Sequence, residues 1–216
     1  MHIEPGVLNA AKIVYANAAA ATVVLGQGRS LWRAPPLIVS TLLAALFFSL
    51  FMEVYHVKIG PSELHFVGAS LVYTVFGLVP TLLGFALGLL LQGAFFEPDD
   101  LLHLGVNSLS LMLPLLAAHA LVGRRFFAAR DQTPAGFAAI IRFDAIYYSG
   151  VVAMVGFWLT LGTEAAAFSA WLVFALSYVP LILCEPLFTA LAVRLLKKVE
   201  TASGIAAYTM VPRLRV

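Results

Sequence analysis

Long apolar stretches, separated by short polar or Gly- and Pro-containing segments, run through nearly the whole sequence. Most of them reach the length of about 17–25 residues that an α-helix needs to cross the hydrocarbon core of a bilayer. The apolar stretches cover residues 9–25, 36–55, 65–96, 101–122, 134–161 and 164–196. The pattern predicts an all-α integral membrane protein.

Composition supports this fold class, because 62% of the 216 residues are hydrophobic and only 11% are charged. Soluble domains carry about 25% charged residues. The net charge of +2 does not suggest nucleic-acid binding, and a single cysteine excludes a disulfide framework. No basic segment precedes the first apolar stretch, so we expect no removable signal peptide and a bacterial or archaeal inner membrane location.

Positive charges predict the orientation of the helices. They follow the first, fourth and last apolar stretches, at Arg29, Arg33, Arg124, Arg125, Arg130, Lys197 and Lys198. The positive-inside rule makes these segments and the C-terminus cytoplasmic, which leaves the N-terminus outside. The stretch 65–96 must then begin and end outside, so we expect two short helices that turn near Gly77 and Pro80. The prediction is about seven transmembrane helices.

A histidine directly follows the first methionine. The α-amino nitrogen of Met1, the amide nitrogen of His2 and the Nδ1 atom of its imidazole can close consecutive chelate rings around one metal ion. Ni²⁺, Cu²⁺ and, less readily, Co²⁺ bind planar nitrogen sets of this kind. The alternative is that His2 is a chance residue in a frayed terminus.

His65 opens the broken stretch on the same predicted side as Met1 and His2, where its imidazole would supply a fourth nitrogen. The alternative is an interfacial histidine with its polar tip in water. His56 and His103 are predicted on that side too and compete for the role. His56 lies in a charged loop, and we expect His103, beside two aspartates, on a solvated polar surface.

Polar residues within membrane spans are costly and usually have partners or functions. Gln92 and Asn107 fall near the outer ends of adjacent segments, where they could orient a ligand or hydrogen-bond the N-terminal loop. Hydrogen bonding between helices without further function is an equal alternative. We expect Glu185 to meet a polar partner at a kink, and Arg142 to pair with Asp144 near the cytoplasmic interface.

Ala16 and Ala20 lie one helical turn apart in the first stretch. Small residues at this spacing suit close packing against another helix, in this protein or in a partner.

Several short motifs follow one another in a fixed order along the chain. They are Met1-His2-Ile3 with Gly6, His65, Phe76-Gly77 with Pro80, Leu90-Leu91-Gln92-Gly93-Ala94, Leu104-Gly105-Val106-Asn107 and Glu185-Pro186-Leu187-Phe188-Thr189-Ala190. This set resembles the CbiM/NikM family, the substrate-binding membrane components of energy-coupling factor cobalt and nickel transporters. The resemblance implies a seven-helix fold whose N-terminal loop folds inward from outside, with Met1, His2 and His65 as metal ligands.

The resemblance also implies partners: a transmembrane coupling protein, a pair of cytoplasmic ATPases and often a small accessory membrane subunit. The chain has no Walker A pattern, so we expect the partners to hydrolyse ATP. The sequence departs from the family around the site. Glu4-Pro5-Gly6 replaces a common Met-Glu-Gly, Phe66-Val67 replaces Pro-Thr, and Glu97-Pro98-Asp99-Asp100 replaces His-Gly-Gly.

The predicted function is therefore capture of Co²⁺ or Ni²⁺ for uptake across the inner membrane, in a chain that is not itself an enzyme. We divide the chain into an N-terminal metal-binding loop (1–8), a transmembrane domain (9–198) and a cytoplasmic tail (199–216). One alternative is a standalone metal importer without ATPases. Another is a membrane-embedded hydrolase that uses His103 with neighbouring carboxylates.

Overall fold

A computed structural model describes residues 2–3, 6–59, 62–127, 135–162, 168–199 and 204–214, and only the backbone of His2, Val199, Gly204 and Ile205. Its helices are α1 (Ala10–Arg33), α2 (Pro36–Val54), α3 (Ala69–Phe76), α4 (Leu78–Phe95), α5 (Leu104–Leu121), α6 (Gly136–Thr160), α7 (Phe168–Ser177) and α8 (Val179–Val199). The strands are β1 (His2–Ile3), β2 (His56–Ile59) and β3 (Ser62–His65), and the 3-10 turns include η1 (Pro98–His103) and η2 (Gly123–Phe127). The all-α membrane class is confirmed, with a small sheet that the hydrophobic pattern did not predict.

Within the described residues, five helical segments are long and apolar enough to cross a membrane. They are Pro36–Val54, Leu78–Phe95, Pro98–Leu121, Gly136–Thr160 and Phe168–Lys198. Helix α1 is long but is not among them, and α3 is too short, because 8 residues rise only about 12 Å at about 1.5 Å per residue. The broken stretch is thus one short helix and one helix of spanning length, rather than the two short helices expected.

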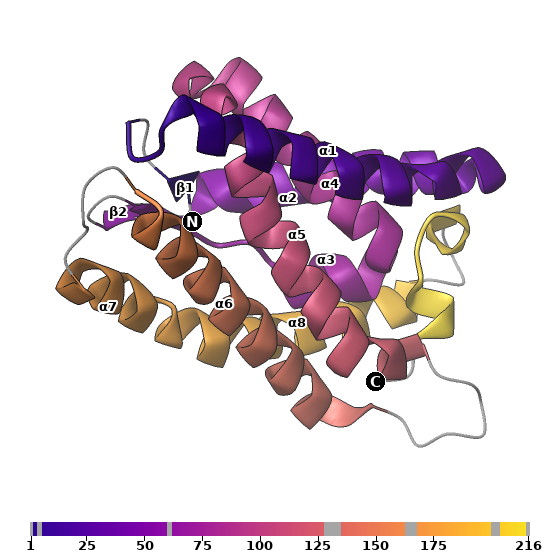
Figure 1. The fold of residues 1–216 in the computed structure, drawn as a ribbon. Helices are drawn as coiled ribbons and strands as arrows, with labels where there is room; N and C mark the ends of the chain where they lie inside the picture. Colours follow the sequence, from indigo (N-terminus) through magenta and orange to yellow (C-terminus); the bar gives the residue numbers. More distant parts are fainter. Residues whose placement is uncertain are drawn as a thin grey trace.

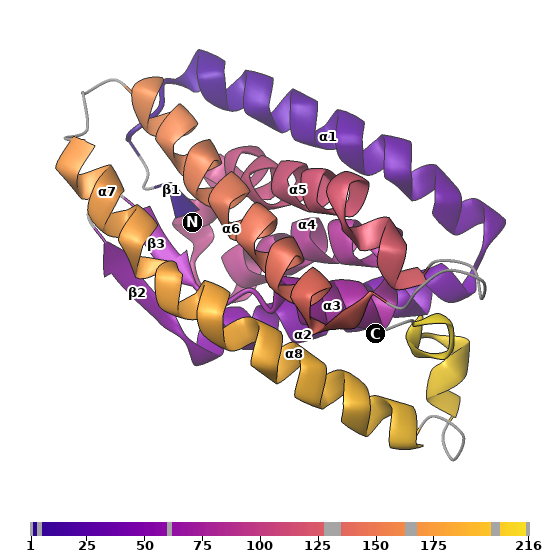
Figure 2. The ribbon, with the colours of Figure 1, turned by 90° about the horizontal axis from the view of Figure 1, so that it is seen from below.

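The sheet and the N-terminus lie at one end of the helix bundle, and the C-terminal segment lies at the other (Figures 1 and 2). The last turns of α1 and α8 and the turn η2, which carry basic side chains, lie at the same end as the C-terminal segment. This common end agrees with the expectation that these segments share one side of the membrane.

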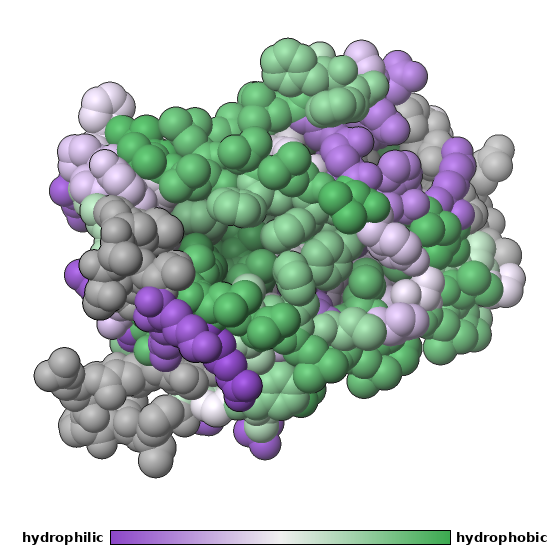
Figure 3. All heavy atoms as spheres, turned by 180° about the vertical axis from the view of Figure 1, so that it is seen from behind, coloured by the Kyte–Doolittle hydropathy of each residue, from purple (hydrophilic) through white to green (hydrophobic). Residues whose placement is uncertain are grey.

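Apolar side chains on the outside of the bundle match a lipid environment. On α8, leucines at every fourth position are exposed over more than half of their surface: Leu183, Leu187, Leu191 and Leu195. Figure 3 shows that hydrophobic side chains also cover a broad central area of one face. In lipid such exposure carries no penalty, so the helices must be held together by close packing and polar contacts.

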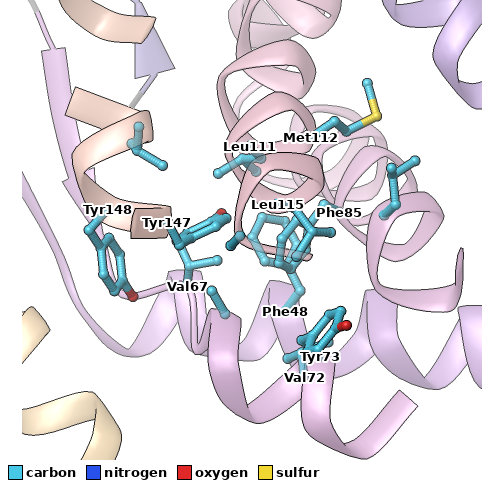
Figure 4. Packing of buried hydrophobic residues seen from close by; sticks show 14 of the residues in the cluster. Phe48, Val67, Val72, Tyr73, Phe85, Leu111, Met112, Leu115, Tyr147 and Tyr148 are labelled. Atoms are coloured by element: carbon cyan, nitrogen blue, oxygen red, sulfur yellow. The ribbon is translucent and has the colours of Figure 1, made fainter. Parts of the chain in front are cut away.

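Close packing is provided by glycines and by aromatic rings. A Cβ atom added to Gly84 of α4 would lie 2.8 Å from the Ala44 Cβ of α2, so the two backbones approach as only small residues allow. Aromatic rings pack against one another in the core (Figure 4). The ring centroids of Phe48 and Phe85 lie 4.8 Å apart, and those of Phe85 and Tyr147 lie 6.2 Å apart. These contacts tie α2, α4 and α6 into one core.

The break between α3 and α4 falls at Gly77, whose φ of 78° and ψ of −178° suit only glycine. The C-terminal segment covers this break. The Met210 amide donates to the Val75 carbonyl at 2.6 Å, and the Ser40 hydroxyl donates to the Tyr208 carbonyl at 2.7 Å. The described part of the C-terminal tail therefore packs against the bundle. There it donates a hydrogen bond to a backbone carbonyl near the end of α3.

Replacing Gly77 with alanine should lower stability by about 1–3 kcal/mol, because this backbone conformation excludes a side chain. The added Cβ would also lie 3.1 Å from the Met210 Cγ atom. Gly26→Ala is the matched control, since nothing lies within 4 Å of a Cβ there, and in a helix interior it should be stabilising by about 0.5–1 kcal/mol. Thermal unfolding in detergent measures both. Equal shifts would contradict the assignment of Gly77 as a conformational requirement.

Candidate metal centre

The first residues of the chain form an edge strand next to His65. Strand β1 pairs antiparallel with β3, with His2 opposite Glu63 and Ile3 opposite Ser62. Positions diagonal to each other across such a pair lie about 7–8 Å apart, within reach of long side chains. His2 and His65 occupy diagonal positions. The backbone register thus brings His2 and Ile3 beside the strand that ends in His65.

Asn107 of α5 holds the other side of β1. Its Oδ1 atom accepts a hydrogen bond from the Ile3 amide at 3.1 Å, and both residues are buried. An unpaired amide here would carry the full penalty of its desolvation. The sequence prediction that Asn107 could hydrogen-bond the N-terminal segment matches this contact, while any part it has in metal binding stays a prediction.

His65 is buried, with 2% of its surface exposed. Its Nδ1 atom lies 3.4 Å from the Met52 carbonyl oxygen, and its Nε2 atom lies 3.1 Å from the Glu63 carboxylate. The ring of His56, from β2, lies 5.9 Å from the His65 ring. The Met52 carbonyl can only accept, so Nδ1 is the donor there, and Nε2 is the ring nitrogen that could bind a metal ion in exchange for its contact with Glu63. His65 is therefore not an interfacial histidine in water.

Met1 and the side chain of His2 lie outside the described residues, so their predicted nitrogen ligands stay predictions. The part of the chain that the structure describes contains no group of three His, Cys, Asp or Glu side chains placed to hold a metal ion. The predicted set differs in kind, because two of its four nitrogens belong to the terminal amine and a backbone amide. The pairing of β1 with β3 places the backbone of His2 near the strand of His65.

Gln92 is buried at the end of α4, where its Nε2 atom donates to the Glu53 carboxylate of α2 at 3.1 Å. This bond joins α4 to α2 at the end of the bundle that carries the sheet. No described contact brings Gln92 to β1, so its predicted role beside the metal stays untested.

Ala16 and Ala20 face this chain's own bundle, with 3% and 6% of their surfaces exposed. Between them in sequence, Asn17 accepts a hydrogen bond from the Gly105 amide at 2.7 Å. A Cβ atom added to Gly105 would lie 2.5 Å from the Asn17 Cα atom. The small residues therefore allow α1 to pack closely against α5, and this contact supports the helix that carries Asn107.

The prediction of a solvated His103 is wrong, because His103 is completely buried. It lies at the end of η1, which packs against β1, α1 and α4. The hydrolase alternative expected His103 on a solvated surface beside its carboxylates, and this burial counts against it. The charged neighbours in η1 hid this burial from the sequence pattern.

A buried polar cluster links α3, α6 and α8. Glu185 of α8 accepts hydrogen bonds from the Ser70 amide at 2.9 Å and from the Tyr148 hydroxyl. Asp144 of α6 accepts from the Ser70 hydroxyl at 2.8 Å. The prediction of a polar partner for Glu185 is confirmed. The predicted pair of Arg142 with Asp144 is wrong, because Asp144 is buried in this cluster while Arg142 is exposed.

Ser70 was missed by the sequence analysis, because a serine in an apolar stretch carries no signal of its own. It lies in the first turn of α3, where backbone amides lack helical partners and the helix dipole is positive. The Glu185 carboxylate satisfies one of these amides from a distant helix. Because α3 follows β3 after three residues, this contact also positions the strand that carries His65.

Comparison with known proteins agrees with this architecture. Residues 2–203 match the model of the CbiM family, described as the cobalt uptake substrate-specific transmembrane region. The chain belongs to the CbiM family. The resemblance inferred from short motifs is thereby confirmed over nearly the whole chain.

Relatives of this CbiM-family chain are described as metal transporters. A Haemophilus influenzae protein with the provisional name metal transport protein is 28% identical over 204 residues, covering 92% of this chain and 94% of its own length. A crystal structure of a transition metal transporter has a TM-score of 0.65 and 17% identity, with 96% of each chain covered. The structural likeness shows a shared fold, and the family places the chain among multi-pass membrane proteins of transition-metal uptake.

Tyr148→Phe should lower stability by about 1–3 kcal/mol, because a buried carboxylate oxygen of Glu185 loses its donor. Tyr147→Phe is the matched control. The two tyrosines are adjacent and fully buried, and the Tyr147 hydroxyl has no hydrogen-bond partner in the described part of the chain. Thermal unfolding of the three proteins in one detergent makes the comparison. A Tyr147→Phe loss as large as that of Tyr148→Phe would refute it.

Asn107→Leu should weaken metal binding about tenfold or more, since about 1.4 kcal/mol corresponds to a factor of ten and the Ile3 amide loses its acceptor. Titration with Ni²⁺ and Co²⁺ measures the affinity. Thr81→Val is the control, because Thr81 is buried and bonds the Gly77 carbonyl at the α3–α4 break. It should lower the melting temperature without changing the affinity. A metal affinity unchanged in Asn107→Leu would show that β1 needs no such anchor.

Proposed function

We propose that this protein captures Co²⁺ or Ni²⁺ outside the inner membrane as the substrate-binding component of an energy-coupling factor transporter. The ion is bound by the terminal amine of Met1, the amide and imidazole of His2, and the imidazole of His65. The ion is the transported substrate and is released toward the cytoplasm after a rearrangement of the bundle.

The observation that carries the proposal is the pairing of β1 with β3, which brings the backbone of His2 and Ile3 beside the strand that ends in the buried His65. This pairing and the Asn107 bond hold β1 on two sides. A frayed terminus would have neither contact. Order in the first residues is what a chelate built from the terminus requires, because flexible ligands lose conformational entropy on binding.

The donor set selects the ion. Nitrogen donors suit Co²⁺ and Ni²⁺, whereas Mg²⁺ and Ca²⁺ prefer oxygen ligands and do not displace an amide proton. Metal binding requires the amine, the amide and both imidazoles to lose protons that compete with the ion. Affinity should therefore fall as the pH is lowered.

The proposed partners follow from the family to which the chain belongs. A transmembrane coupling protein and a pair of cytoplasmic ATPases supply the energy, and a small accessory subunit completes the complex. The basic ends of α1, α5 and α8 face the cytoplasm, so the sheet faces outside. The cytoplasmic side then carries the C-terminal segment that covers the α3–α4 break.

Elemental analysis of the purified protein tests the site. The native chain should carry Co²⁺ or Ni²⁺, and His2→Ala and His65→Ala should lose most of it. His56→Ala is the control, because its ring packs against His65 but belongs to the exposed edge strand. A residue added before Met1 should abolish binding, since it turns the amine into an amide. Full metal retention in the extended chain would falsify the terminal chelate.

Uptake assays separate the two modes of transport. Cells that produce the chain alone should accumulate no metal, and cells that also produce the coupling protein and ATPases should accumulate it. Uptake by the chain alone, lost in His2→Ala, would instead favour the standalone importer and leave the metal site intact.

A further inference from the structure

His103 is a buried imidazole that the proposed metal site does not use. None of its surface is exposed, and neither of its ring nitrogens has a hydrogen-bond partner within the described residues. Buried polar groups in native proteins are nearly always paired with protein atoms, water or an ion. A neutral imidazole has one donor and one acceptor nitrogen, so His103 leaves both functions unused. The arrangement suggests that a ligand supplies the missing partner.

The position of His103 points to the N-terminal segment. His103 ends η1, and Asn107 lies one helical turn further along, at the start of α5. Asn107 binds the Ile3 amide, and η1, which ends in His103, packs against β1. His103 therefore belongs to a turn that contacts β1, while His65 lies on β3, the strand that pairs with β1.

The chemistry of the terminal chelate leaves a place for such a ligand. Three nitrogens from residues 1–2 and one from His65 form a planar set, which leaves the positions above and below the plane open. Imidazole nitrogen is a good ligand for both Co²⁺ and Ni²⁺. β1 pairs with the strand of His65 and packs against the turn that ends in His103, so both histidines belong to elements that contact β1.

We propose that His103 is an additional, axial nitrogen ligand of the captured metal ion and that it favours Co²⁺ over Ni²⁺. The inference rests on the proposed function, because it requires the terminal nitrogen chelate. Planar low-spin Co²⁺ has one electron in the orbital that points along the axis, and it readily accepts a fifth nitrogen. Planar low-spin Ni²⁺ has two electrons there, which repel an axial ligand.

Electron paramagnetic resonance of the full-length protein loaded with Co²⁺ under anaerobic conditions tests the assignment. An axial ¹⁴N ligand shares the unpaired electron of low-spin Co²⁺ and splits each cobalt line into a triplet. The triplet should be present in the native protein and absent in His103→Ala. Protein with ¹⁵N-labelled histidine should show doublets instead. Unsplit lines in the native, metal-loaded protein would overturn the assignment.

Two further variants distinguish the loss of an axial ligand from a general loss of structure. His119→Ala removes another histidine of α5, which bonds the Tyr73 hydroxyl at 2.6 Å and lies near the opposite end of the helix. It should retain the triplet. In His103→Gly, free imidazole added to the buffer should enter the vacated space and restore the triplet. Failure of the rescue in a variant that melts like the native protein would count against an axial role.

Affinity measurements test the selectivity. His103→Ala should weaken Co²⁺ binding at least tenfold and Ni²⁺ binding much less. An equal loss for the two ions would refute the selectivity. The same measurements distinguish an error in the axial ligand from an error in the proposed metal site. If His2→Ala still binds Co²⁺ as tightly as the native chain, the terminal chelate is wrong. If binding depends on His2 and His65 but the native spectrum lacks the nitrogen splitting, only the role of His103 is wrong.

Discussion

The pairing of His2 and Ile3 with β3 links the N-terminal strand to the rest of the molecule. A terminal chelate can act only if the terminus is held, because an ordered ligand loses less entropy when it binds a metal ion. Here β3 holds one side of β1 and the Asn107 side chain holds the other. The packing of α1 against α5, the burial of His65 and the position of η1 all serve this arrangement.

A second constraint is the need to pair the backbone amides at the start of α3, which begins inside the bundle shortly after β3. The free amides at a helix start need acceptors, and a bilayer supplies none. Glu185 accepts from one such amide and so ties α8 to α3, and Asp144 joins the same serine from α6. These bonds join the three helices to one another and, through α3, to the strand that precedes it.

At the opposite end of the bundle, the C-terminal segment packs over the break between α3 and α4. Met210 pairs the carbonyl of Val75 near the point where Gly77 breaks the helix. The sheet, where the metal site is proposed, and the C-terminal segment that covers this break lie at opposite ends of the bundle (Figure 2). The N-terminal strand thus pairs with the strand that precedes α3, and the C-terminal segment covers the break between α3 and α4.

By itself, the sequence determined the membrane class, the break at Gly77 and the motifs that identify the family, because hydrophobic length and glycine geometry are local properties. It also singled out Asn107 and Glu185 as polar residues in need of partners. Tertiary structure alone decided which partners these were: Asp144 joined Ser70 and not Arg142, and His103 became buried despite its charged neighbours. Burial and pairing depend on segments far apart in the chain, which no local pattern records.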